Sequence, residues 1–119
     1  MYSALLLDHF QNPRNAGELA DANATAEIDN PVCGDVLRLT MKVTEGRITD
    51  IRFKAKGCVA SMACASALTE LALGKTPDEA CAMSRESLTA AVGGLPQSSA
   101  HAAQLALDAL SAALGSLKS

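Results

Sequence analysis

The sequence predicts an α+β fold, with a small three-stranded antiparallel sheet that carries helices packed on one face. Between residues 24 and 55, segments alternate between apolar and polar residues, which is typical of strands with one buried face. From residue 58 on, apolar residues recur about every 3.6 positions, which indicates amphipathic helices. Strands followed by a run of helices favour one layer of helices on one sheet. The 119 residues show no repeat, linker or low-complexity segment, so we expect a single domain over residues 1–119.

The N-terminal region begins with a short helix over residues 3–10. Pro13 ends this helix, because a proline disfavours helical geometry in the residue before it. Residues 12–17 (NPRNAG) are rich in turn-forming types and predict an ordered loop. A first strand then covers residues 24–29.

Two longer strands follow, over residues 36–44 and 48–55. Each alternates strictly enough to give it one apolar and one polar face, and Glu45-Gly46 between them predicts an antiparallel hairpin. Because the second face is polar, we expect the sheet to be covered on one side only.

Helices make up the rest of the chain. The first begins at Cys58 and ends at Gly74, with an apolar stripe formed by Ala60, Ala63, Cys64, Ala67, Leu68 and Leu71. Thr76 starts a short second helix as its N-cap residue, with proline at the first position and Glu79 at the third, close to a capping box. Ser84 opens a third helix, which Gly93 ends. The last helix runs from about residue 99 to residue 117, with a buried stripe rich in alanine and leucine.

Composition and charge exclude several classes of protein. A net charge of −3 and a pI near 5.2 argue against nucleic-acid binding, which requires a basic face. No apolar run reaches the roughly 18 residues of a membrane span, and the first residues do not resemble a secretory signal. Four unevenly spaced cysteines without such a signal indicate free thiols in a reducing cytosol, so we expect a cytoplasmic protein.

Two cysteines stand at element ends, where ligands and nucleophiles are presented. Cys33 precedes Gly34 at a strand entrance, with Asp35 two residues on, and Cys58 follows a glycine at the start of the long helix. A helix N-terminus favours negative charge, and hence a thiolate that can bind metal or attack sulfur. With His101 at the head of the last helix, these residues predict a soft-metal or sulfur site built from three segments.

Each of these four residues also has a simpler interpretation. Cys58 could be a small apolar N-cap, and Cys33 on its own is as consistent with the core as with a ligand. Asp35 taken alone is more typical of a turn or strand-end hydrogen bond, and His101 of a capping or surface residue.

The other two cysteines are predicted to pack rather than to bind. Cys64 lies in the apolar stripe, six residues after Cys58, and this spacing places the two about 240° apart around a helix and roughly 9 Å apart along it. Cys81 lies in a short helical segment (EACAM) and is expected to be a core position.

Three motifs, in this order and spacing, resemble the IscU/NifU-type iron–sulfur cluster assembly scaffolds. They are residues 8–17 (DHFQNPRNAG), residues 33–35 (CGD) and residues 52–58 (RFKAKGC). The resemblance covers nearly the whole chain and is highly specific in combination. It implies the small α+β layer of the IscU/SufE-like fold and a scaffold rather than an enzyme. Such a scaffold receives sulfur from a cysteine desulfurase, takes up iron, assembles a 2Fe–2S cluster and passes it to acceptor apoproteins.

Position by position, the resemblance implies a set of site residues. Cys33 and Cys58 match two of the family's three cysteine ligands, Asp35 matches the acidic residue that modulates cluster lability, and His101 matches the histidine at the head of the last helix. We therefore expect Cys33, Asp35, Cys58 and His101 to bind the cluster or a metal ion, either iron or, in purified protein, zinc. Thiolates select iron–sulfur clusters and zinc, whereas aspartate and histidine are weaker, exchangeable ligands.

The chain departs from the family at the start of the last helix. Residues 95–102 read LPQSSAHA, so Ala102 replaces the third ligand cysteine and Ser99 stands where the family has lysine. The altered segment 95–99 puts recognition by an Hsp70-type chaperone in doubt. With two site cysteines per chain, a cluster would be labile or would be bridged by a homodimer that supplies four thiolates. The alternatives are a zinc-dependent sulfur-transfer protein of the SufU type and a small metal-binding paralogue without assembly activity.

Overall fold

The computed structural model describes residues 2–30 and 34–117, and confirms the predicted α+β class. Three strands, β1 (Ala24–Asn30), β2 (Asp35–Thr44) and β3 (Arg47–Lys56), form one antiparallel sheet in the order β1-β2-β3. The helices are α1 (Ala4–Gln11), α2 (Val59–Ala72), α3 (Pro77–Cys81), α4 (Arg85–Ala91) and α5 (His101–Gly115), with a 3₁₀ turn η1 (Gln97–Ser99) before the last. Among the described helices, none combines the length and apolar character that crossing a bilayer requires.

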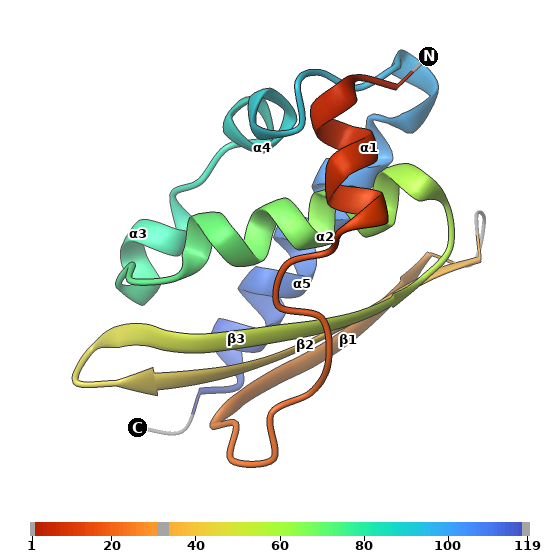
Figure 1. The fold of residues 1–119 in the computed structure, drawn as a ribbon. Helices are drawn as coiled ribbons and strands as arrows, with labels where there is room; N and C mark the ends of the chain where they lie inside the picture. Colours follow the sequence, from red (N-terminus) through yellow and green to blue (C-terminus); the bar gives the residue numbers. More distant parts are fainter. Residues whose placement is uncertain (1, 31–33, 118–119) are drawn as a thin grey trace.

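The helices lie on one face of the sheet, as predicted (Figure 1). Helix α2 packs on β3, α5 packs on β1 and β2, and α1 packs on α2. The core between these layers is aliphatic, with Leu37, Leu39 and Ile51 fully buried on the inner face. Five of the ten buried residues of α2 and five of the seven buried residues of α5 are alanines, and their small side chains let the two helices pack closely.

An extra residue in β3 explains its irregular apolar spacing. Ile48 and Ile51 are three positions apart, yet both are completely buried. The pairing of β2 with β3 shifts between Lys42 and Val43, so Thr49 has no partner in β2. Such a bulge moves one residue out of the alternation and returns Ile48 to the inner face.

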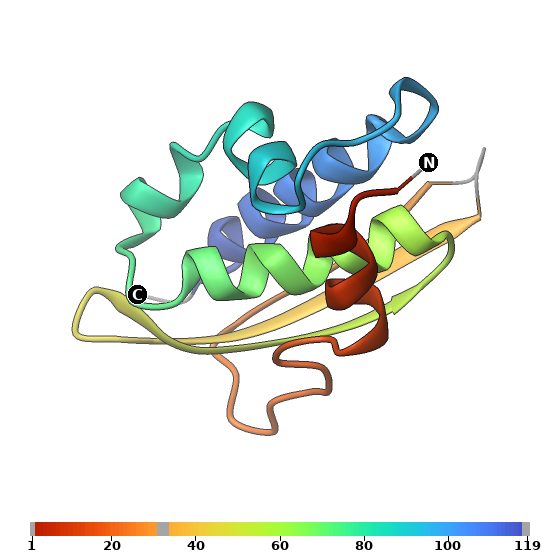
Figure 2. The same ribbon diagram turned by 45° about the horizontal axis from the view of Figure 1, so that its top comes forward.

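The outer face of the sheet is not wholly uncovered, so the prediction of one covered side is wrong in part. Residues 12–23 leave α1, pass the edge of β3 and cross this face (Figure 2). Ala16 forms a parallel bridge with Phe53 at the edge of β3. Further on, the backbone N–H of Leu19 donates to Thr40 Oγ1 at 3.0 Å, and Thr40 is buried on the face that the sequence marks as polar.

The start of the last helix also differs from the prediction. Residue 99 belongs to η1, and regular α-helix begins at His101 and ends at Gly115. The other helix starts agree with their predicted caps: Thr76 and Glu79 form a complete capping box, and Ser84 caps α4. No local sequence signal marks the start of α5, because Ala100 has no side chain that could cap the helix.

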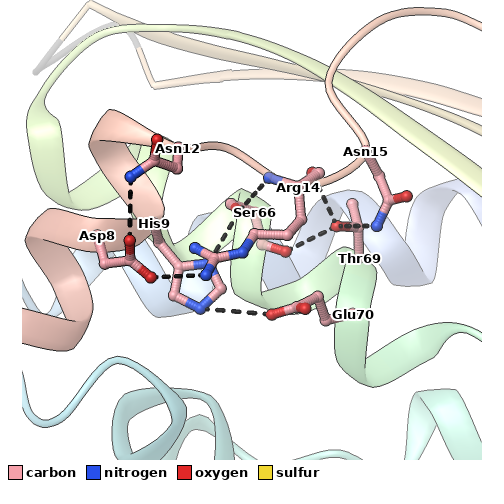
Figure 3. Close-up of polar contacts among 8 residues, drawn as sticks. All are labelled: Asp8, His9, Asn12, Arg14, Asn15, Ser66, Thr69 and Glu70. Carbon is pink, nitrogen blue, oxygen red and sulfur yellow. Dashed lines mark hydrogen bonds and ion pairs between the residues drawn. The ribbon is translucent and has the colours of Figure 1, made fainter.

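A polar cluster around the buried side chains of His9 and Ser66 holds α1 and the following loop on α2 (Figure 3). His9 Nδ1 lies 2.9 Å from Ser66 Oγ, which also accepts the backbone N–H of Arg14 at 2.8 Å. On the other side of the ring, His9 Nε2 lies 3.5 Å from Glu70 Oε1, and Arg14 pairs with Asp8 at 2.6 Å. Side chains of the motif at residues 8–17 thus attach the N-terminal segment to α2.

We expect this attachment to make the fold less stable at acidic pH. Burial, followed by the charge of Arg14, lowers the pKa of His9 below its ordinary value of 6.5, against the opposing charges of Glu70 and Asp8. Between the two pKa values the unfolded chain binds more protons at His9, so stability rises with pH there and is lost as pH falls below about 6.5. Urea midpoints measured between about pH 7.5 and about pH 5.5 should fall less in His9→Gln than in the parent. Equal slopes in the two proteins would contradict this role, and His101→Gln separates the contribution of the second histidine.

Candidate metal centre

Three of the four predicted site residues meet at one end of the molecule. Asp35 is the first residue of β2, Cys58 is the N-cap of α2 and His101 is the first residue of α5. Asp35 Oδ2 lies 3.8 Å from Cys58 Sγ and 3.3 Å from His101 Nε2, and the three ligand atoms all lie within 4.8 Å of one another. The fourth residue, Cys33, lies outside the described residues, and its part in the site stays a prediction.

The three donors suit a zinc or iron ion. A thiolate sulfur, an imidazole nitrogen and a carboxylate oxygen form a mixed set that a tetrahedral ion accepts. Zinc–sulfur bonds are about 2.3 Å and zinc–nitrogen bonds about 2.0–2.1 Å, so a tetrahedral ion holds its sulfur and nitrogen ligand atoms about 3.6 Å apart. The described ligand atoms lie within 4.8 Å of one another, so modest side-chain rotations would bring them around an ion. Asp35 is buried while Cys58 and His101 are half-buried, so the set is reachable from solvent on one side.

Local structure fixes the carboxylate of Asp35. Its Oδ1 accepts the backbone N–H of Cys58 at 3.0 Å, and the preceding residue, Gly57, has a φ of +147°. A Cβ atom at Gly57 would lie 2.0 Å from Asp35 Oδ1. Glycine is therefore required both by its backbone conformation and by the close approach of the carboxylate. The Gly57-Cys58 pair, which the sequence marks as a chain reversal, is the support on which Asp35 rests.

Asp35 remains ionised in this buried position because it is well supplied with donors. Burial raises its pKa, but hydrogen bonds from Ser61, from the Cys58 N–H and from His101, together with the charge of His101, hold the pKa of Asp35 below its ordinary value. The site thus contains an anionic oxygen that is ready to bind a cation.

Ser61 is a site residue that the sequence analysis missed. Its Oγ donates to Asp35 Oδ2 at 2.7 Å and lies 3.3 Å from Cys58 Sγ, and its side chain is buried. Ser61 also donates its backbone N–H to Cys58 Sγ, the N-cap contact of α2, at 3.4 Å. The position three residues after an N-cap is where a side chain reaches back to that cap. A polar residue there, in the otherwise apolar first part of the helix over residues 59–65, is the signal that could have identified Ser61.

The remaining cysteines lie elsewhere. Cys64 is fully buried in α2, as predicted, and burial, with a smaller contribution from Cys58, raises the pKa of its thiol to about 12. A thiol with so high a pKa stays protonated at neutral pH, whereas metal ions bind the thiolate. The prediction that Cys81 belongs to the core is wrong, because Cys81 is exposed at the end of α3 while its neighbour Ala80 is buried. Ala102 is buried beside His101 in the sequence and offers no ligand atom in place of the family's third cysteine.

Comparisons with known proteins show which proteins this chain resembles. The iron-sulfur cluster assembly scaffold protein IscU 1 of Archaeoglobus fulgidus is 46% identical over 114 residues, which cover 96% of this chain and 74% of the relative. IscU of Escherichia coli is 40% identical over 122 residues, covering 99% of this chain and 94% of the relative.

Solved structures share the fold at lower identity. A NifU-like protein (N-terminal) from Brucella abortus superposes with a TM-score of 0.82 at 19% identity, over 97% of this chain and 92% of that chain. A protein of the SUF system from Fervidobacterium islandicum gives a TM-score of 0.81 at 22% identity, over 95% of this chain and 96% of that chain. The family described as NifU-like N terminal domain matches residues 1–119. The resemblance read from the three motifs is confirmed, and the chain belongs to the NifU-like N terminal domain family.

Proposed function

We propose that this protein is a scaffold, not an enzyme, on which a 2Fe–2S cluster is assembled from iron and sulfur and then passed to acceptor apoproteins. The observation that carries the proposal is the meeting of Asp35, Cys58 and His101 from three separate segments. Cys33 completes the proposed ligand set. Two relatives, of which this chain covers 74% and 94%, are named as iron–sulfur cluster assembly scaffolds, which supports the same role here.

The donor chemistry suits a cargo that must leave. Four thiolates would hold a cluster as ferredoxins do, whereas aspartate and histidine are weaker ligands for iron. The free thiols of Cys58, Cys64 and Cys81 fit a reducing compartment, and we place the protein in the cytoplasm. The partners that we propose are a cysteine desulfurase and the acceptor apoproteins. The changed segment 95–99 speaks against delivery by an Hsp70-type chaperone.

Because Ala102 supplies no thiolate, we propose that a cluster is held by two chains. Each chain would contribute Cys33 and Cys58, giving the four thiolates that a 2Fe–2S cluster accepts. A second candidate function is that of a zinc-dependent sulfur-transfer protein of the SufU type. If Cys33 joins Asp35, Cys58 and His101, one chain would provide four ligands for a single zinc ion.

Anaerobic reconstitution tests these proposals. The protein is incubated with Fe²⁺, L-cysteine and a catalytic amount of cysteine desulfurase, and persulfide on the protein is assayed. A thiol reductant is then added, which supplies the electrons that convert persulfide sulfur to sulfide, and visible absorption, iron, sulfide and size-exclusion elution are recorded. We expect the absorption of a 2Fe–2S cluster, in a dimeric fraction, that Cys58→Ser abolishes and Cys81→Ser leaves unchanged. Zinc retained with a persulfide on Cys58 and no cluster would instead identify the sulfur-transfer function. Bound metal without sulfide or persulfide would leave only a metal-binding paralogue.

A further inference from the structure

We propose that the Ser61 hydroxyl competes with a bound metal ion for the Asp35 carboxylate, and so makes Asp35 a weak ligand that is easily released. This inference rests on the proposed metal-binding function and concerns how firmly the site holds its cargo. It assigns a role to a residue that contributes no ligand atom of its own to the set formed by Asp35, Cys58 and His101.

The Ser61 hydroxyl is buried, so water does not compete for its hydrogen bond. Its side chain is 5% exposed in the first turn of α2, between Asp35 and Cys58. Its single hydroxyl hydrogen is donated to Asp35 Oδ2 at 2.7 Å, the shortest of the polar contacts to this carboxylate among the described residues. A hydrogen bond of this length to an ionised acceptor is strong and draws charge from the oxygen.

A bound ion would change the contacts that Asp35 Oδ2 makes. In the structure this oxygen faces Ser61 Oγ, His101 Nε2 and Cys58 Sγ. When Cys58 and His101 bind an ion, each directs a lone pair to the metal and neither can donate a hydrogen to Asp35. The Ser61 hydroxyl binds no metal and keeps its hydrogen bond. Among the described residues, the Ser61 hydroxyl is therefore the group that stays hydrogen-bonded to Asp35 Oδ2 while this oxygen also binds the ion.

Ser61 is not needed to hold the Asp35 carboxylate in place. Asp35 is already fixed through its other oxygen, which accepts the Cys58 N–H and lies against the Cα of Gly57, where no Cβ could fit. These contacts survive the loss of the Ser61 hydroxyl. Its removal leaves the metal-free carboxylate short of one donor in a buried place, and a cation compensates for that loss. Metal binding should consequently become tighter.

The test compares Ser61→Ala with Ser66→Ala. Both replace a buried serine of α2, and Ser66 bonds to His9 and Arg14, away from the ligand set. Zn²⁺ affinity is measured by competition with a chromophoric chelator, and release by transfer to excess chelator. Ser61→Ala should bind Zn²⁺ more tightly, by up to about tenfold. The hydrogen bond is stronger to the free carboxylate than to a carboxylate that also binds an ion, and its full worth to a charged group sets the upper limit. Release from this variant should slow, and its Co²⁺ absorption bands should shift. Both variants should be less stable without metal, but Ser66→Ala should keep the parent affinity and spectrum.

Two further variants connect the effect to the hydroxyl and to Asp35. Ser61→Thr restores a hydroxyl and should restore the parent affinity and release rate. In an Asp35→Asn background, Ser61→Ala should have no effect on affinity, as a double-mutant cycle requires for two groups that act together. Unchanged or weaker Zn²⁺ binding by Ser61→Ala, while Cys58→Ser abolishes binding, overturns the role of Ser61 alone. Zn²⁺ binding that survives Cys58→Ser overturns the proposed metal centre and this inference together.

Discussion

Gly57→Ala should destabilise the fold and displace Asp35 at the same time. The φ of +147° at Gly57 is strained for any residue with a Cβ, and such strain amounts to about 1–3 kcal/mol. The new Cβ would also lie 2.0 Å from Asp35 Oδ1 and 3.0 Å from Asp35 Cα. Because the second of these atoms belongs to the backbone, the clash cannot be relieved by a side-chain rotation alone, and overpacking adds about 1–3 kcal/mol.

Gly46→Ala is the matched control for this prediction. Gly46, in the hairpin turn, has a φ of +78° and open space where a Cβ would be placed, so the substitution introduces backbone strain without a clash. The free energy of unfolding, measured in urea, should fall by about 1–3 kcal/mol more in Gly57→Ala than in Gly46→Ala. Gly57→Ala should also lose Zn²⁺ affinity, because Asp35 moves, whereas Gly46→Ala should keep it. Equal losses of stability together with equal Zn²⁺ affinities would show that Gly57 does not support the site.

The sequence predicted those elements whose signals are local. The two long strands follow from apolar alternation, and the start of α2 at Cys58 follows from the change of apolar period after Gly57. Both are present in the structure within one or two residues. The bulge at Thr49 was not predicted, although the three-residue spacing of Ile48 and Ile51 is the sequence signal for it. Cys81 was misplaced because α3 has only five residues, too few for a helical pattern to define a buried face.

The site itself could not be assembled from local signals. Asp35 is 23 residues from Cys58 and 66 from His101, and no periodicity relates positions so far apart. Their places at element ends already suggested one site built from three segments, and the resemblance to a family gave the same residues. The structure places Asp35, Cys58 and His101 next to one another. Ser61 belongs to the same cluster but escaped notice, because it carries no ligand atom that a search for metal-binding residues would seek.

Cys58→Ser should remove the metal and leave the fold intact. Serine is a preferred N-cap residue, and its hydroxyl can accept the Ser61 N–H as the Cys58 sulfur does. Without metal, the variant should therefore unfold at the same temperature as the metal-free parent or slightly above it. Zinc and iron bind the thiolate form of cysteine, whereas the serine hydroxyl stays protonated at neutral pH and is a poor ligand. A loss of metal in this variant is consequently a loss of the ligand and not of the structure around it.

Metal content after dialysis against a weak chelator measures this effect. The parent should retain about one zinc or iron ion per chain, as a single four-ligand site predicts, and Cys58→Ser close to none. Cys81→Ser changes an exposed thiol and should match the parent. Cys64→Ala removes a fully buried sulfur, so it should lower the unfolding temperature while keeping the metal. If Cys58→Ser keeps its metal and Cys64→Ala or Cys81→Ser loses it, the ion is held by other thiols and the centre at Asp35, Cys58 and His101 is not its binding site.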